Sequence, residues 1–83
     1  MEEHEVGKIT HFFTKIGVAI VQVTAPFNVG EKIHIKGATT DITEVVESMQ
    51  VQHAPVKEVK KGDDIGLKVK DQVRPGDTLF KVL

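Results

Sequence analysis

The sequence predicts an all-β fold, and in more detail a small closed antiparallel β-barrel of about six or seven strands. Val, Ile and Thr recur in short runs that Gly, Pro, Asn or Asp interrupt, which is typical of strands joined by tight turns. No window has the i, i+3, i+4 and i+7 apolar spacing of a capped helix. Without helices to cover a sheet, a chain of 83 residues hides its apolar faces and strand edges best by closing the sheet.

The first half of the chain contains three predicted strands. The first covers residues 6–13 and ends at a turn formed by Thr14 and Lys15, and the second covers residues 18–24. Pro26 ends the second strand because it cannot donate a hydrogen bond to a sheet. Residues 31–36 alternate between apolar and polar side chains, which predicts a strand with one face on the core and one in water.

The second half contains four predicted strands. Residues 42–53 form the longest extended segment, and the adjacent Val45 and Val46 break its alternation, which predicts a β-bulge. Shorter strands are predicted at 56–59, 65–69 and 78–82. We expect residues 1–5 to be a flexible N-terminus and residues 6–83 to form a single β-barrel domain.

One short motif recurs where predicted strands begin. Residues 29–33, 61–65 and 75–79 share the form x-Gly-(Asp/Glu)-x-(Ile/Leu). The glycine can adopt a positive φ without a Cβ clash, and the acid that follows can accept hydrogen bonds from the turn backbone. The motif therefore predicts three corners of the same kind.

The composition excludes several classes of function. Eleven Lys and Arg residues oppose twelve Asp and Glu residues, so the net charge of −1 gives no general attraction to nucleic acid. The absence of cysteine excludes disulfides and thiolate metal sites, and the length excludes a large multi-step enzyme. The longest apolar run, residues 16–21, is far shorter than a membrane span, and the acidic start is unlike a signal peptide, so we expect a cytoplasmic location.

Catalysis and metal binding are not predicted. Asp63 and Asp64 are interpreted as turn acids, and Ser48, the only serine, lies in a predicted strand rather than in a nucleophile motif. Four histidines have spacings that match no compact metal motif and are expected on the surface or on strand faces: His4, His11, His34 and His53. We expect no enzyme activity, no metal and no cofactor.

Two kinds of side chain are candidates for binding a partner. Basic residues gather before and after the corner at 61–65, where a shared face would contact phosphates; the alternative is a solvated face whose charges nearby carboxylates offset. Of the adjacent rings of Phe12 and Phe13, one is expected in the core and the other on the surface, where it could stack on a base, unless both are buried. The candidates are Lys57, Lys60, Lys61, Lys68, Lys70, Arg74 and Phe12.

Six short segments occur in an order that is typical of a known family. They are Val-Gly-Lys-Ile-Thr at 6–10, Gly-Val-Ala-Ile at 17–20, Val-Gly-Glu-Lys-Ile-His-Ile-Lys-Gly at 29–37, Val-Glu-Ser-Met-Gln at 46–50, Lys-Gly-Asp-Asp-Ile-Gly-Leu at 61–67 and Pro-Gly-Asp at 75–77. In this order they resemble the second domain of translational GTPases of the elongation factor Tu type, and the chain is most similar to the free-standing translation elongation factor-like proteins.

This resemblance implies a closed β-barrel of the elongation factor Tu domain 2 type, which in the full factors helps to hold the 3′ end of aminoacyl-tRNA. Gln50 stands where the family has a glutamate that holds the terminal nucleotide, His53 stands where it has an arginine, and Lys68 replaces an apolar wall residue. No Gly-x-x-x-x-Gly-Lys-(Ser/Thr) loop occurs, so GTP binding is not expected.

The sequence and this resemblance therefore predict a non-catalytic translation elongation factor-like module that binds tRNA, rRNA or a protein of the translation machinery; its oligomeric state is left open, with a monomer favoured. The alternative is a protein-interaction or accessory module with no RNA role, because similar barrels also end larger proteins such as collagenase-like peptidases. Fold alone does not decide between these functions.

Overall fold

The computed structural model describes residues 3–52 and 54–82, and these residues form ten β-strands. The first five are β1 (Glu3–Phe13), β2 (Val18–Val23), β3 (Phe27–Asn28), β4 (Lys32–Lys36) and β5 (Asp41–Val45). The other five are β6 (Met49–Val51), β7 (Ala54–Val56), β8 (Glu58–Val59), β9 (Asp64–Lys68) and β10 (Thr78–Val82). The all-β prediction is confirmed, and no helix long and apolar enough to span a membrane occurs in the described residues.

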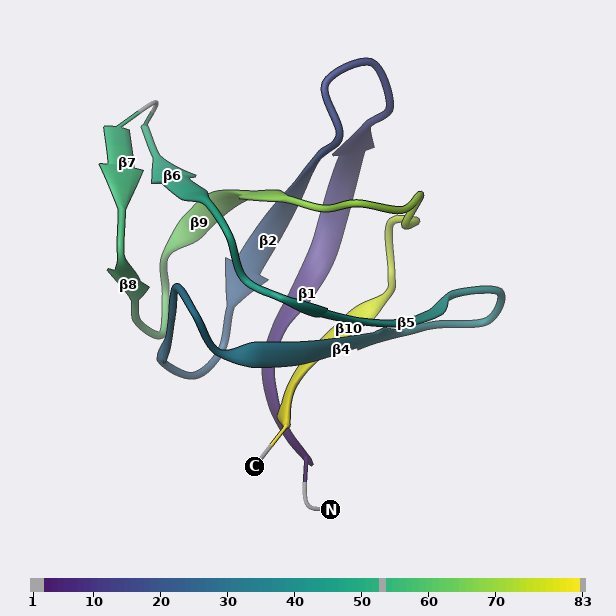
Figure 1. The fold of residues 1–83 in the computed structure, drawn as a ribbon, viewed down its shortest axis with the longest axis horizontal. Helices are drawn as coiled ribbons and strands as arrows, with labels where there is room; N and C mark the ends of the chain where they lie inside the picture. Colours follow the sequence, from purple (N-terminus) through teal and green to yellow (C-terminus); the bar gives the residue numbers. More distant parts are fainter. Residues whose placement is uncertain (1–2, 53, 83) are drawn as a thin grey trace.

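Eight strands form one antiparallel sheet in the order β5-β4-β10-β1-β2-β9-β6-β7, and β3 pairs with β8 in a separate small sheet. The start of β1 and the end of β10 lie side by side, and the turn between β1 and β2 lies at the opposite end of the molecule (Figure 1). The predicted closed barrel is not found, because no pairing joins the edge strands β5 and β7 in the described part of the chain. The large sheet is therefore open.

The prediction of a single strand over 42–53 is wrong, because separate strands occupy the two parts of this range. Strand β5, at one edge of the sheet, ends at Val45. Strand β6 begins at Met49 near the opposite edge, where it pairs with β9. Between them, the backbone N–H of Val46 donates to the Glu31 carbonyl at 2.9 Å, so Val46 is tied to a corner and not to a bulged ladder. Val45 and Val46 therefore stand where the chain leaves the edge strand β5 and crosses toward β6.

The bulges of this fold lie in β1. Its pairing with β10 shifts register between Glu5 and Gly7, and its pairing with β2 shifts between Ile9 and His11. The first shift makes the neighbours Val6 and Gly7 both buried, which strict alternation would not allow. The sequence gives no sign of either shift because each depends on the partner strand.

The three predicted corners are confirmed in detail. Gly30, Gly62 and Gly76 have φ values of 94°, 95° and 94°, as the third residue of a type II turn requires. In the last corner the Asp77 N–H donates to the Arg74 carbonyl at 3.1 Å, and the Asp77 carboxylate accepts from the Arg74 N–H at 2.8 Å. The same two bonds join Glu31 with Asn28 and Asp63 with Lys60.

Each corner also binds one buried residue that is distant in sequence through two backbone hydrogen bonds. Gly76 donates to the Ile9 carbonyl at 2.7 Å, and the Ile9 N–H donates to the Asp77 carbonyl at 2.8 Å. The same reciprocal pair connects the Gly62 corner with Val23 and the Gly30 corner with Val46. The three corners therefore attach separate parts of the curved sheet to one another.

The core lies inside this curved sheet. Phe27 of β3 is the largest of its side chains and is 1% exposed, and Phe12, Ala25 and Ile42 are among the partly buried residues packed against the core. The buried apolar residues are Val6, Ile9, Ala19, Val21, Val23, Phe27, Ile33, Ile35, Val46, Met49, Val59, Ile65, Leu67, Val69, Val73 and Leu79.

Candidate binding groove

A groove lies on the outer face of the sheet and follows β9, with β1 and β2 on one side and β6 on the other. Even-numbered residues of β2 and β9 point outward, since the odd-numbered Ala19, Val21, Ile65 and Leu67 are buried. Across the strands, Ile20 is paired with Gly66, and Gly66 with Gln50. Gly66, which has no side chain, therefore lies between the apolar side chain of Ile20 and the amide side chain of Gln50.

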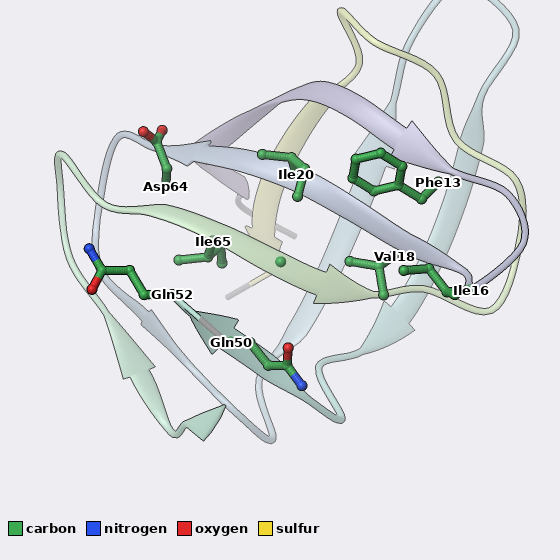
Figure 2. A pocket seen from close by; sticks show the side chains of 9 residues that line it. Phe13, Ile16, Val18, Ile20, Gln50, Gln52, Asp64 and Ile65 are labelled. Atoms are coloured by element: carbon green, nitrogen blue, oxygen red, sulfur yellow. The ribbon is translucent and has the colours of Figure 1, made fainter. Parts of the chain in front are cut away.

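The groove has a volume of about 360 Å³ and mainly apolar walls. Phe13 is 50% exposed and Ile16 is 64% exposed, although both are large apolar side chains. With Val18 and Ile20 they form the apolar wall, and Gln50 and Gln52 lie on the opposite side (Figure 2). Mainly apolar concave surfaces with a few polar groups are typical of ligand sites.

Charged side chains lie near the two ends of the groove. Asp64 lies at the end far from Ile16 (Figure 2). At the Ile16 end, the groove continues into a smaller hollow lined by Ile16, Val18, Ser48 and Lys68, among others. The groove is therefore acidic at one end, apolar in the middle and basic at the other end.

Some predicted site residues lie at this groove and others do not. Gln50 lines it, and Lys68 lines its continuation. Phe12 packs against the core, so the exposed ring of the pair is Phe13. The prediction for His53 lies outside the described residues.

The predicted basic residues are divided by β9. Lys57, Lys60 and Lys61 precede Asp64, the first residue of β9, whereas Lys68 ends the strand. A strand of this length separates its ends by about 13 Å. Beyond it, the Lys70 ammonium forms an ion pair with Glu47 at 3.1 Å, which raises the lysine pKa, and Arg74 belongs to the corner before β10.

His34 lies on the sheet far from the groove, between two carboxylates. Its Nδ1 is 2.8 Å from Glu3 Oε2 of β1, and its Nε2 is 2.5 Å from Asp41 Oδ1 of β5. The hydrogen bond with Asp41, together with that of Glu3, raises the pKa of His34 against the opposing effect of burial. Only the imidazolium can donate to both acids, so this histidine acts as a cationic link between β1, β4 and β5.

This link predicts a pH dependence of stability. Because the folded pKa of His34 is raised, its stabilising effect is complete below the unfolded value of about 6.5 and is lost as the pH rises through the folded pKa. In urea titrations, we expect the stability difference between the wild type and His34→Gln to be larger at pH 6 than at pH 9. A difference that is equal or larger at pH 9 would contradict this assignment.

In residues 3–52 and 54–82 there is no group of three or more His, Asp or Glu side chains suited to hold a metal ion. Asp63 is a turn acid, as predicted, because its carboxylate accepts from the Lys60 N–H at 3.1 Å. Asp64, its neighbour, is instead one of the residues that line the groove, at one of its ends.

Sequence reasoning identified Gln50 and Lys68 but missed the apolar wall. The signal was present in residues 18–23, where Val18 and Ile20 are apolar on the face opposite to Ala19 and Val21. A strand that is apolar on both faces is either covered on both or exposes one apolar face. Strand β2 exposes one apolar face.

The fold and the groove define a small all-β module with one core and one apolar outer face. A solved structure with this fold is the C-terminal domain of a Geobacillus thermoleovorans protein that is described as a U32 peptidase. It has a TM-score of 0.90 and 19% identity, and the match covers 96% of this chain and 93% of that domain. The selenomethionine variant of the same domain matches with a TM-score of 0.87 and 19% identity, over 92% of this chain and 96% of that one.

The sequence is similar to parts of longer proteins. An uncharacterized protease of Methanocaldococcus jannaschii is 38% identical over 77 residues, and a collagenase of Porphyromonas gingivalis is 35% identical over 78 residues. Each match covers 92% of this chain, but only 19% of the protease and 22% of the collagenase. The chain thus spans about a fifth of the length of these relatives, and no family model matches it.

These comparisons correct the interpretation of the chain as a translation elongation factor-like protein. Its relatives are a protease and collagenases, and the domain that shares its fold comes from a protein described as a U32 peptidase. The predicted role in translation and the predicted binding of tRNA or rRNA are therefore wrong. The physical reason is that Gly-acid corners specify how strands are joined, and this leaves the ligand undetermined.

Proposed function

We propose that the chain is a non-catalytic accessory module that acts with a collagenase-like peptidase, either in one polypeptide or as a separate partner. The observation that carries this proposal is the extent of the sequence match. Nearly the whole chain aligns with about a fifth of a protease and a collagenase. A segment of that size leaves most of each relative to supply the catalytic machinery.

The chemistry of the described residues supports a non-catalytic role. Both ring nitrogens of His34 are engaged by carboxylates, so neither is available to take a proton from a nucleophile. Ser48 is the only serine of the chain, and there is no cysteine. The backbone carbonyl of Ser48 accepts a hydrogen bond from Lys68 N–H at 3.1 Å, which places this serine in the sheet framework beside the groove.

A graft tests this proposal. The segment of the Porphyromonas gingivalis collagenase that aligns with this chain is deleted, or replaced by this chain, and hydrolysis of collagen is measured for both proteins. We expect the deletion to reduce hydrolysis and the graft to restore part of it. An unrelated β-domain of similar size serves as the control graft.

Two results would contradict the accessory role. One is a deletion that leaves hydrolysis unchanged, since the segment would then contribute nothing to the peptidase. The other is a graft that is folded by circular dichroism and yet no more active than the control graft.

A further inference from the structure

The outer groove has the length and the charge arrangement to hold a short peptide. Asp64, Gly66 and Lys68 alternate on the outward face of β9, so the two charged residues lie about 13 Å apart along the groove. An extended peptide of three or four residues spans about 10–14 Å. The length of such a peptide therefore matches the backbone spacing of Asp64 and Lys68.

Both charged groups are open to a ligand. In the described part of the chain, no ion pair involves the carboxylate of Asp64 or the ammonium of Lys68, whereas the nearby Lys70 is already paired with Glu47. A free peptide carries an ammonium group at one end and a carboxylate at the other. Asp64 is complementary to the first group, and Lys68 to the second.

The floor and walls of the groove suit the body of such a peptide. A Cβ atom on Gly66 would lie 3.2 Å from Cγ1 of Val18, so the absence of a side chain keeps the floor low. Phe13 and Ile16 present exposed apolar surface to a ligand side chain. Gln50 and Gln52 line the groove opposite this wall, and their carboxamides carry both donors and acceptors for a peptide backbone (Figure 2).

We propose that the groove binds a short apolar peptide in extended form, with its free ammonium group at Asp64 and its free carboxylate at Lys68. This choice of ligand rests on the accessory role proposed above, because hydrolysis of a peptide bond produces chains with one free ammonium and one free carboxylate. The module then retains substrate fragments or products beside the peptidase.

Titration of the ¹⁵N-labelled chain with the tetrapeptide Leu-Ala-Val-Leu, followed by NMR, tests this binding. We expect amide signals of β2, β6 and β9 to shift with saturation. The matched control is the same tetrapeptide with an acetylated N-terminus and an amidated C-terminus, which loses both charges. We expect the capped peptide to bind at least about tenfold more weakly, because each exposed charge contact contributes a factor of about three to five.

Three variants locate the site. Asp64→Asn and Lys68→Gln should each weaken binding of the free tetrapeptide about three- to fivefold. Gly66→Val should abolish binding, because its side chain fills the floor against Val18. The exposed residues Asp71 and Lys32 lie outside the groove, so Asp71→Asn and Lys32→Gln are the matched controls and should bind like the wild type.

The outcomes separate this proposal from the accessory role. A free tetrapeptide that shifts no groove amide at millimolar concentration, or a capped peptide that binds equally well, overturns the peptide site. The peptide titration uses the isolated chain, whereas the collagenase graft uses a complete peptidase. The first therefore tests the peptide site and the second tests the accessory role, independently of each other. Because Asp64 and Lys68 are exposed, their variants remain informative even where Gly66→Val fails to fold.

Discussion

Replacing Phe27 with alanine should lower the free energy of unfolding by about 3–5 kcal/mol, because the substitution leaves a cavity in the centre of the core. Phe27 is 1% exposed and has the largest fully buried side chain of the described residues. It also lies in β3, opposite Val59 of β8, so its ring fixes the small sheet to the core. A loss of this size is a large part of the stability of a small domain.

Urea unfolding followed by far-ultraviolet circular dichroism measures this loss. The matched control is Phe13→Ala, which removes the same atoms from a side chain that is 50% exposed and should cost less than about 1 kcal/mol. If Phe27→Ala does not fold, Phe27→Leu should still cost about 1 kcal/mol. Equal losses at positions 27 and 13 would show that the core does not depend on Phe27.

Replacing Gly37 with alanine should lower the free energy of unfolding by about 3 kcal/mol, because the added methyl group overlaps a buried side chain. A Cβ atom at this position would overlap the Asp77 carboxylate, with Oδ1 as its nearest atom. Asp77 is 4% exposed and accepts the Arg74 N–H in its own corner, so it cannot move without losing that bond.

Gly66→Ala is the matched control for this substitution. It adds the same methyl group at a glycine whose new neighbour, Cγ1 of Val18, lies 3.2 Å away on a partly exposed side chain. Thermal unfolding should therefore show a much smaller change for Gly66→Ala than for Gly37→Ala. Similar changes in both variants would mean that Asp77 yields easily, and that its corner is not rigid.

The sequence predicted the features that depend on a few neighbouring residues. The corners at Gly30, Gly62 and Gly76 were predicted because a glycine followed by an acid defines the turn locally. The split between Val45 and Met49 was not predicted, because the partner of Val46 is a corner that precedes it by an entire hairpin. Side chains 18 and 20 were assigned to one face correctly, but their place beside Gln50 follows from the strand order β2-β9-β6.

Function was predicted less well than fold for a related reason. Three of the six segments that resembled a translation factor contain a Gly-acid corner, and the others lie in or beside strands, so their order describes how strands are connected. The alternative of a peptidase accessory module agrees better with the sequence relatives, although no local motif distinguishes it. The groove, in contrast, depends on outward side chains of the β1–β2 hairpin and of β6 and β9, which are distant from that hairpin in sequence.

The position of the last strand has a consequence for how this chain acquires its structure. Strand β10 lies between β1 and β4 in the sheet, and the corner before it holds Ile9 of the first strand. Strand β1 can pair with β2 early, but its hydrogen bonds with β10 and with the corner before β10 cannot form until β10 is available. Contacts between such distant residues slow folding, so we expect native structure to appear only after synthesis of the C-terminal strand, in a single late step.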